Sequence, residues 1–377
     1  MIKKIQVANY KSIDKLEFEL GRINVLIGEN GAGKSNILEA IALAGAAAAD
    51  KLDNEFLTSR GIRVTRPEYM RPAFPGLQSL AKIEVGIGAS KSDFFLAKLN
   101  NDNVPYSKWE AEIKMILNIN DTNKYSAHHV PVETVEIYTS CTNSMNTVRV
   151  ETNLSIYINN FILYSPENSA LRTFQREGQI EPLGINGEGL LKLLSVLSRP
   201  EYSESLNEII NSLQILGWFE DLTLTEAELL AGSRMEIKDR YLDETRRYFD
   251  QLSTNEGFLF LLFYFALFST DLTPTFFAID NIDASLNPKL CEKLMRELVA
   301  LAEKHDKQVI FTTHNPAILD GLNLDDDEQR LFVVSRNKNG ATRLKRVNKP
   351  VTPTGERPTR LSELFLRGVL GGLPKGF

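Results

Sequence analysis

A glycine-rich run near the N-terminus has the residue types and spacing needed to bind phosphate. Residues 28–35 match every fixed position of the pattern G-x-x-x-x-G-K-[ST]. In such a loop the backbone N–H groups surround the phosphates, the lysine reaches the β- and γ-phosphates, and the serine hydroxyl binds Mg²⁺. The predicted nucleotide-binding residues are therefore Gly28, Glu29, Asn30, Gly31, Ala32, Gly33, Lys34, Ser35 and Asn36.

A phosphate loop needs an acidic residue at the end of a neighbouring strand to help hold Mg²⁺. Asp280 follows the apolar run Thr275–Ile279, so Ser35 and Asp280 are the predicted metal ligands. A second apolar run, Gln308–Thr312, is followed closely by His314, which in this position can reach a γ-phosphate.

The elements around the loop are those that would position it. The apolar run Ile23–Ile27 predicts a buried strand directly before the loop. A helix is predicted to begin near Lys34, with one apolar face formed by Ile37, Leu38, Ala40 and Ile41. A helix N-terminus at this point would present N–H donors to the phosphates.

The second half of this α/β unit lies at the other end of the chain. From residue 270 onwards strands and helices alternate, which implies a mainly parallel sheet. The predicted strands are Thr275–Ile279, Gln308–Thr312, Leu331–Val334 and Thr342–Val347. One helix is predicted over Pro288–Lys304 and another from Pro316. Residues 1–180 and 270–377 are thus expected to form one nucleotide-binding lobe.

Two other regions separate these ends. Residues of about 80–165 predict an antiparallel β-meander, with runs at Ala81–Ile87, Trp109–Leu117, Thr134–Ser140, Thr147–Ile158 and Phe161–Tyr164. Residues 181–269 are expected to form a helical lobe, because leucine and isoleucine recur there at helical spacing. One short strand, Met235–Leu242, is predicted inside this lobe.

The composition is that of a globular protein without membrane spans. The chain has 377 residues, of which 43% are hydrophobic and 24% charged, and this suits about two domains or lobes. Its most apolar stretch, Gly257–Ser269, is too short to cross a bilayer. Cys141 and Cys291 suggest neither a disulfide framework nor a metal site, which favours the cytoplasm. His128 and His129 lie in a polar stretch and are expected at the surface.

The charge distribution leaves one question open. The formal net charge of −6 does not indicate nucleic-acid binding. However, residues 336–349 carry basic side chains and no acidic one, namely Arg336, Lys338, Arg343, Lys345, Arg346 and Lys349. This run is either a solvated hairpin turning at Asn339-Gly340 or a surface that contacts DNA or a partner.

Four segments together resemble ABC-type ATPases of the RecF/SMC/OLD class, whose short members are often labelled AAA family ATPases. Residues 28–41 resemble the extended Walker A motif of that class, and 278–288 resemble Walker B with the D-loop. Residues 312–316 resemble the switch-histidine loop, and 361–374 the C-terminal tail of some short members. The resemblance implies an ABC-type ATPase head with a P-loop sheet, a β-meander and a helical lobe, and no long coiled coil.

The resemblance also implies a mechanism. Two heads would form a homodimer, or part of a larger homo-oligomer, with ATP and Mg²⁺ held between the Walker motifs of one subunit and a signature segment of the other. Here the signature candidate is Leu252–Gly257, in which Ser253 or Asn255 takes the place of the usual serine and Gly257 follows. An alternative is that this segment only caps a helix.

One departure from the family pattern concerns catalysis. The residue after the Walker B aspartate is Asn281, where the family normally has a glutamate that polarises the attacking water. An amide is a poor proton acceptor, and loss of a general base costs about 10²–10⁴-fold in rate. We therefore expect a slow ATPase, with Asn281 and His314 at the reacting end and Asp283 as the candidate substitute base.

The remaining function depends on analogy. No acidic cluster suited to a TOPRIM-like nuclease follows the ATPase motifs, and no heptad run suggests SMC arms. We expect a sensor or scaffold subunit that works with a separate effector protein, such as a nuclease in anti-phage defence. The alternatives are a RecF-like DNA-repair clamp and an ATP-dependent regulator that binds no nucleic acid.

Overall fold

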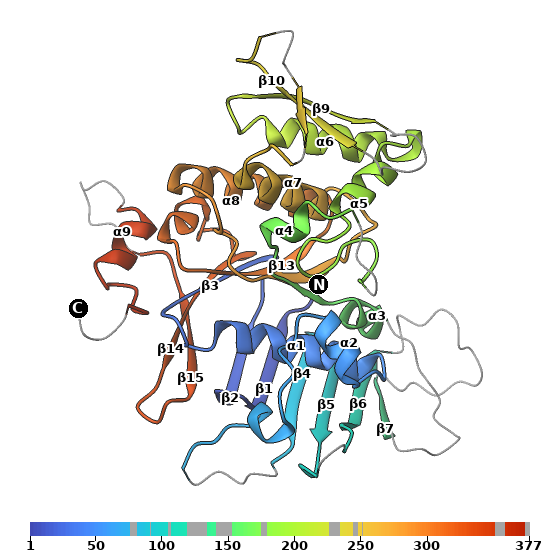
Figure 1. Ribbon diagram of the computed structural model, residues 1–377. Helices are drawn as coiled ribbons and strands as arrows, with labels where there is room; N and C mark the ends of the chain where they lie inside the picture. The colour runs from blue at the N-terminus through green and yellow to red at the C-terminus, as the bar shows by residue number, and fades with distance from the viewer. Residues whose placement is uncertain are drawn as a thin grey trace.

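The computed structural model of the chain describes residues 1–75, 81–90, 92–104, 107–118, 134–140, 153–174, 179–225, 234–243, 248–250, 252–350 and 359–373. These residues form stacked layers (Figure 1). An antiparallel sheet lies under helix α1, a mainly parallel sheet lies on the other side of α1, and further helices cover the far face of the parallel sheet. His128, His129 and Cys141, discussed above, lie outside the described residues.

The mainly parallel sheet confirms the predicted α/β class. Its strand order is β15-β14-β3-β13-β12-β8, and only the β14–β15 pair is antiparallel. In chain order the strands are β3 (Ile23–Ile27), β8 (Ile162–Tyr164), β12 (Phe276–Ile279), β13 (Gln308–Thr313), β14 (Gln329–Arg336) and β15 (Thr342–Val347). The N-terminal and C-terminal parts of the chain therefore meet in one sheet.

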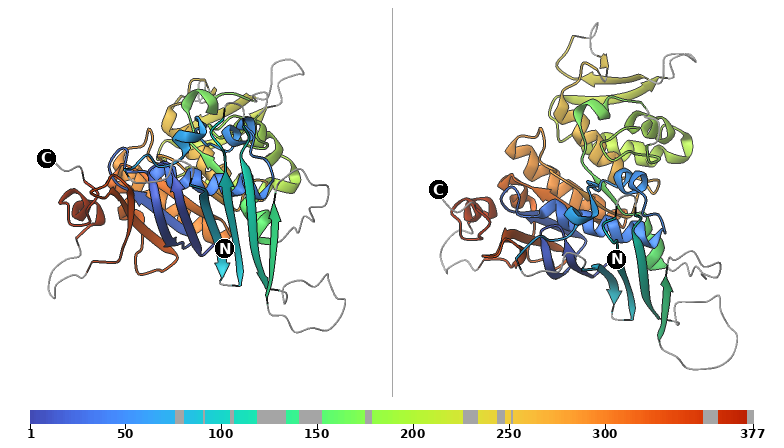
Figure 2. Two further views of the ribbon diagram at one scale, coloured as in Figure 1. Left: turned by 90° about the horizontal axis from the view of Figure 1, so that it is seen from below. Right: turned by 60° about the horizontal axis from the view of Figure 1, so that its bottom comes forward.

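The antiparallel sheet continues the N-terminal hairpin. Its strand order is β2-β1-β4-β5-β6-β7, and the views from below and from the tilted side show its strands along one side of α1 (Figure 2). The strands are β1 (Lys4–Tyr10), β2 (Ile13–Glu19), β4 (Ile83–Ser90), β5 (Asp93–Asn100), β6 (Glu110–Asn118) and β7 (Thr134–Ser140). The meander is thus an extension of the first hairpin rather than a separate sheet.

Helices fill the space between and beyond the sheets. They are α1 (Lys34–Ala48), α2 (Asn54–Ser59), α3 (Asn153–Asn159), α4 (Asn168–Leu171), α5 (Leu190–Leu197), α6 (Ser203–Leu213), α7 (Glu256–Phe268), α8 (Pro288–Lys304) and α9 (Leu361–Leu366). Short 3₁₀ helices are η1 (Pro67–Met70), η3 (Pro200–Tyr202) and η5 (Pro316–Gly321). Among the described residues α8 is the longest helix, with 17 residues, so this part of the chain contains no long coiled coil.

The parallel sheet is buried on both faces, which explains why its strands read as continuous apolar runs. All five residues of β3 are buried. Leu26 points toward α1 and the antiparallel sheet, whereas Val25 and Ile27 point toward α7 and α8, as strand alternation requires. Helix α7 is buried along almost its whole length beneath the helical region. The two hydrophobic cores therefore share one sheet and fix it in place.

The structure corrects two strand predictions. In the stretch Thr147–Ile158, the described residues form helix α3 instead of a strand, because Leu154 and Ile158 share one helical face and are buried. The sequence pattern places Phe161–Tyr164 in the meander, but these residues include β8, which is an edge of the parallel sheet and pairs with β12. The chain crosses from one sheet to the other through α3, and this crossover leaves no local signal in the sequence.

Two further differences concern elements that the sequence did not predict. Strand β5 was missed, although Phe95, Ala97 and Leu99 alternate as a half-buried strand does. In the helical region one strand was expected at Met235–Leu242, but a three-stranded sheet forms from β9 (Phe219–Thr225), β10 (Arg234–Asp239) and β11 (Tyr248–Asp250). The helix expected from Pro316 is the short η5.

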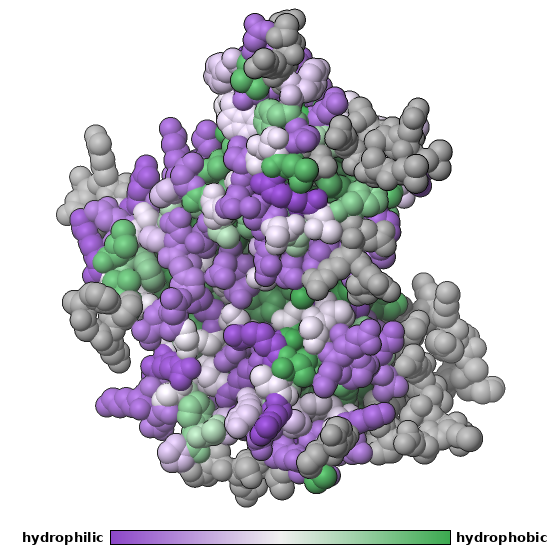
Figure 3. Space-filling view, viewed as in Figure 1, coloured by the Kyte–Doolittle hydropathy of each residue, from purple (hydrophilic) through white to green (hydrophobic). Residues whose placement is uncertain are grey.

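The visible surface is largely hydrophilic (Figure 3). A small hydrophobic area lies over α9, where Leu366 and Val369 are exposed. Across the described ranges, no helix combines the length and apolar character needed to cross a membrane.

Candidate functional site

The phosphate loop joins the carboxyl end of β3 to the first turn of α1. Gly31 and Gly33 have positive φ values of 75° and 105°, a backbone conformation that favours glycine. A Cβ atom built on Gly28 would lie 2.1 Å from the carbonyl oxygen of Val334, so only glycine fits there. No side chain among the described residues caps α1, which leaves its first N–H groups available to an anion.

The Lys34 side chain folds back over the loop. Its Nζ donates to the carbonyl oxygens of Gly28, at 2.8 Å, and Glu29, at 3.0 Å. Burial lowers the pKa of Lys34 to about 8, and this effect is opposed mainly by the carboxylates of Asp280 and Asp283. A nucleotide phosphate placed in the loop would give this ammonium group the anionic partner that the carbonyls only partly replace.

The two predicted metal ligands lie together. The Ser35 hydroxyl donates to Asp280 Oδ2 at 2.8 Å, and the Thr312 hydroxyl donates to Asp280 Oδ1. These oxygen atoms suit Mg²⁺, which usually takes one or two protein ligands and completes its shell with water and substrate phosphates. The described residues contain no group of three His, Cys, Asp or Glu side chains that could form a larger metal cluster.

The predicted catalytic residues meet at the ends of β12 and β13. The Asn281 backbone has φ 56°, and its N–H donates to Thr312 Oγ1 at 2.9 Å. Asp283 Oδ1 accepts hydrogen bonds from the Thr313 hydroxyl, at 2.6 Å, and from the His314 N–H, at 3.4 Å. Asp283 is therefore tied to the His314 loop.

The electrostatic surroundings favour a neutral His314. Partial burial and the nearby Lys34 ammonium lower the pKa of His314, while Asp283 and Asp280 raise it less. A neutral imidazole can either donate or accept a hydrogen bond at a phosphate. The structure thus brings Lys34, Asp280, Asp283 and His314 into one electrostatic group, and Ser35 is hydrogen-bonded to Asp280.

The signature candidate surrounds the start of α7. Asn255 is the N-cap, and its side chain accepts from the Phe258 N–H at 2.9 Å, which matches the helix-cap alternative for this residue. Arg172 holds the preceding turn through the carbonyls of Leu252, at 3.0 Å, and Thr254, at 2.8 Å. Within the described part of this single chain, no observed hydrogen bond links Ser253, Asn255 or Gly257 to the phosphate loop.

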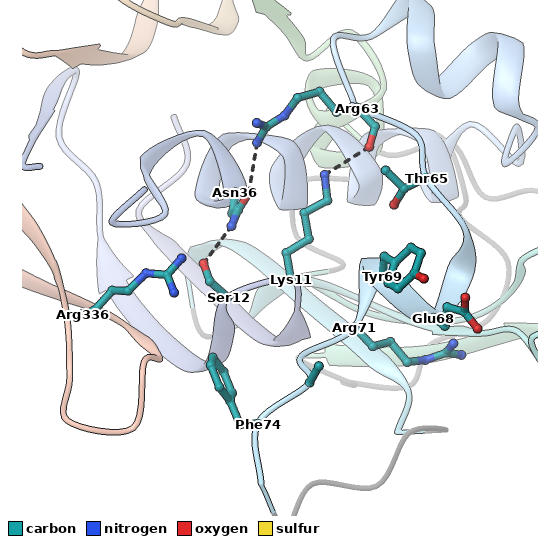
Figure 4. A pocket seen from close by; sticks show the side chains of 11 residues that line it. Lys11, Ser12, Asn36, Arg63, Thr65, Glu68, Tyr69, Arg71, Phe74 and Arg336 are labelled. Carbon is teal, nitrogen blue, oxygen red and sulfur yellow. Dashed lines mark hydrogen bonds between the residues drawn. The ribbon is translucent and has the colours of Figure 1, made fainter. Parts of the chain in front are cut away.

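A cavity of about 480 Å³ lies beside the phosphate loop and α1 (Figure 4). Its lining includes Lys11, Ser12, Asn36, Arg63, Tyr69 and Arg336. Asn36 donates to the Ser12 hydroxyl at 2.7 Å and accepts from Arg63 at 3.1 Å. The sequence singles out only two of these residues, Asn36 in the phosphate loop region and Arg336 in the basic run. The others come from segments far apart in the sequence and form no local motif, so the sequence does not predict them as part of a site.

The basic run forms the predicted hairpin, but its charges do not make one continuous surface. Arg346 pairs with Asp327 and Lys349 with Asp325, and Arg336 donates to the Gly31 carbonyl at 2.8 Å. The other basic side chains are exposed, namely Lys338, Arg343 and Lys345.

The C-terminal tail connects two parts of the site. At one end, the Ser362 N–H and hydroxyl donate to Asp320 of η5, at 2.9 and 2.6 Å, just beyond the His314 loop. At the other end, a Cβ atom built on Gly372 would lie 3.5 Å from Gly28 Cα and 2.7 Å from Val333 Cγ1. The tail backbone therefore packs directly against the first residue of the phosphate loop.

Comparison with known families and proteins gives consistent results. The family model described as "AAA domain, putative AbiEii toxin, Type IV TA system" matches residues 23–320. An OLD nuclease from Thermus scotoductus is 24% identical over 352 residues, covering 85% of this chain and 60% of that protein. The DNA replication and repair protein RecF from Bacillus thuringiensis is 40% identical over 55 residues, covering 14% of this chain and 15% of that protein. The chain thus spans 60% or less of either relative's length.

Among solved structures, an SMC head bound to the C-winged helix domain of ScpA aligns with a TM-score of 0.57 and 14% sequence identity, covering 92% of this chain and 98% of that one. At this identity the alignment reports the fold alone. It confirms the fold expected from the resemblance, that of an ABC-type ATPase head.

The contact between the tail and the loop can be tested with two neighbouring glycines. Gly371 and Gly372 have φ values of 80° and 83°, so alanine strains the backbone similarly at both. Only at Gly372 would the new methyl group clash, at 2.7 Å from Val333 Cγ1, and because it would also lie in contact with Gly28 Cα at 3.5 Å, any shift that relieves the clash occurs next to the loop. We expect Gly372→Ala to weaken ATP binding about fivefold or more and Gly371→Ala to have much less effect, as measured by calorimetry. Equal affinities in the two variants would contradict this prediction.

Proposed function

We propose the following function for the chain, which belongs to this AbiEii-type family of AAA domains and has the fold of an ABC-type ATPase head. Two copies of the chain bind ATP and Mg²⁺ between them, hydrolyse ATP slowly, and in the ATP-bound form hold a separate effector protein. The observation that carries the proposal is the Ser35–Asp280–Thr312 arrangement beside the phosphate loop, with Asn281 in place of an acidic residue.

In this proposal each group of residues in the site has a separate role. Backbone N–H groups of loop 28–35 and the Lys34 ammonium bind the phosphates, and Ser35 and Asp280 hold Mg²⁺. The metal, when bound, neutralises charge that develops on the phosphate oxygens. His314 contacts the γ-phosphate, and Asp283 orients its loop through the Thr313 hydroxyl and the His314 N–H.

Slow hydrolysis follows from the groups near the attacking water. The Asn281 side chain can orient water but accepts a proton poorly. Asp283 is the nearest alternative acid in sequence, and one of its oxygens is already engaged by the His314 loop. This engagement favours a positioning role for Asp283 over that of a general base.

Replacement of Asn281 tests this assignment. We expect Asn281→Glu to raise the rate of ATP hydrolysis by about 10-fold or more, because it supplies a general base, whose full contribution is typically about 10²–10⁴-fold. Phosphate release at saturating ATP is the measurement. If the rate does not rise, the missing base is not the limit. Complete loss of turnover in Asp283→Asn, which keeps an oxygen that can accept from Thr313 and His314 but is a poor proton acceptor, would instead identify Asp283 as the base.

A two-subunit arrangement is supported by the position of the signature candidate. Ser253, Asn255 and Gly257 lie at the start of the 13-residue helix α7, whose N-terminal end attracts anions. An ATP bound to one copy would present its γ-phosphate to this helix end of the other copy, whereas ADP would not. ATP thereby joins the two copies.

Analytical ultracentrifugation with Mg²⁺ and either nucleotide tests this arrangement. We expect dimers or larger assemblies with ATP and monomers with ADP, because only ATP carries the γ-phosphate. Lys34→Ala is the matched control, since it removes the phosphate-binding cation and should stay monomeric with both nucleotides. Assembly that is equal in ATP and ADP would contradict the sandwich.

The effector role rests on the family and on one relative. The family description names a toxin of a toxin–antitoxin system, and the OLD relative is named as a nuclease. These names support a place in anti-phage defence, in which the ATP-bound assembly acts as a sensor or scaffold for an effector such as a nuclease.

A RecF-like DNA clamp is the second candidate, favoured by the RecF match and by the exposed cations Lys338, Arg343 and Lys345. If these side chains contact DNA phosphates, their joint replacement by glutamate should weaken DNA binding at least tenfold and reduce its salt dependence. A filter-binding or anisotropy titration at several salt concentrations measures this effect. Unchanged DNA affinity would show that these side chains of the hairpin do not contact DNA.

A further inference from the structure

The hairpin between β14 and β15 holds the phosphate loop from outside. Arg336 and Thr342 are opposite each other in the β14–β15 register. Arg336 Nε donates to the Gly31 carbonyl at 2.8 Å, and the Thr342 hydroxyl donates to the next carbonyl, that of Ala32, at 3.0 Å. Two successive carbonyls of the loop are thus fixed toward the hairpin by one cross-strand pair.

The Thr342 side chain is fixed by further hydrogen bonds, whereas the Arg336 guanidinium is not. The Thr342 hydroxyl also contacts the Ser12 hydroxyl at 2.7 Å, and the Thr342 N–H donates to the Ser12 carbonyl at 2.8 Å. Arg336 is exposed. For the part of the chain that the structure describes, its Nε bond to Gly31 is the one hydrogen bond observed for its guanidinium, and no ion pair is seen. A guanidinium has five N–H donors, so most of them remain available.

The position of Arg336 indicates which ligand these donors would meet. Arg336 lines the cavity beside the loop, and Figure 4 shows its guanidinium pointing from the hairpin toward the side of Ser12 and Asn36. Next to Gly31, a Cβ atom built on the residue would meet nothing within 4 Å, so this side of the loop is open. A phosphate group bound in the loop would place an anion beside the carbonyl that Arg336 already holds.

The strand order distinguishes Arg336 from the residues at the γ-phosphate. Asp280 and His314 follow β12 and β13, on one side of β3, whereas Arg336 ends β14, on the other side of β3. The loop that follows β3 therefore lies between the two groups. Arg336 is placed to meet the part of the nucleotide that ATP and ADP share.

We propose that Arg336 is a nucleotide-contacting residue, which binds the phosphate chain of ATP and of ADP on the side facing the cavity while it holds the Gly31 carbonyl. This deepens the proposed ATP-binding function and rests on it. One cation of the basic run is thereby assigned to the nucleotide instead of to DNA or a protein partner.

Binding of ATP and of ADP, each with Mg²⁺, tests the proposal by calorimetry at several salt concentrations. Arg336→Gln keeps a side-chain amide that can donate to Gly31 but removes the positive charge. We expect it to weaken both nucleotides about tenfold, by the same factor, and to reduce the salt dependence of binding. Arg343→Gln is the matched control, because it removes one charge from the exposed face of the same hairpin, and it should bind both nucleotides like the native chain.

Other outcomes overturn the inference. If Arg336→Gln binds like the native chain while Arg336→Ala is weak, Arg336 only supports the loop. If Arg343→Gln is weakened equally, the effect is a general one of hairpin charge. A loss confined to ATP would place Arg336 at the γ-phosphate and contradict the strand-order argument. If the native chain binds neither nucleotide, the proposed function itself fails, and that result is distinct from all of these. Equal melting temperatures of the variants without nucleotide exclude misfolding.

Discussion

The carboxylate of Asp280 is the contact on which the rest of the site depends. One of its oxygens accepts from Ser35 at the start of α1, and the other accepts from Thr312 at the end of β13. The same Thr312 hydroxyl oxygen accepts a hydrogen bond from the Asn281 N–H. A single carboxylate therefore connects the phosphate loop, the strand that bears Asp280 and the strand that leads to His314. These three segments are far apart in the sequence, and burial of the parallel sheet on both faces is what holds their ends at one edge.

The sequence alone predicts those parts of the site that are formed by residues close together in the chain. The octet 28–35, the strand before Asp280 and the strand before His314 are local patterns, and the structure places each between the expected elements. The same holds for α8, whose bounds agree with the prediction at both ends. In these segments the hydrophobic period and the turn residues indicate the same element, so local information is sufficient.

The sequence could not reveal the contacts that close around the loop. These contacts come from three other parts of the chain. Ser12 lies in the turn between β1 and β2, Arg336 and Thr342 belong to the β14–β15 hairpin, and Gly372 belongs to the C-terminal tail. Their side chains are ordinary, and only the fold makes them neighbours. The error at β8 has the same origin, because three apolar residues fit either sheet. Which sheet takes them depends on the crossover through α3, that is, on which long-range pairing buries them.

The distribution of contacts suggests which part of the site is free to respond to ATP. The phosphate loop is held on one side by the hairpin carbonyl contacts, on the other by Asp280, and at Gly28 by the tail. A loop held in this way has little ordering entropy left to lose when phosphate binds. The His314 loop has a different connection, since Asp283 holds it through one oxygen atom and the tail reaches η5 just beyond it. We infer that nucleotide binds to a largely preformed loop, and that the presence of the γ-phosphate is registered mainly at the His314 side. In the proposed function, Asn281 as a weak proton acceptor would prolong this state with the γ-phosphate bound.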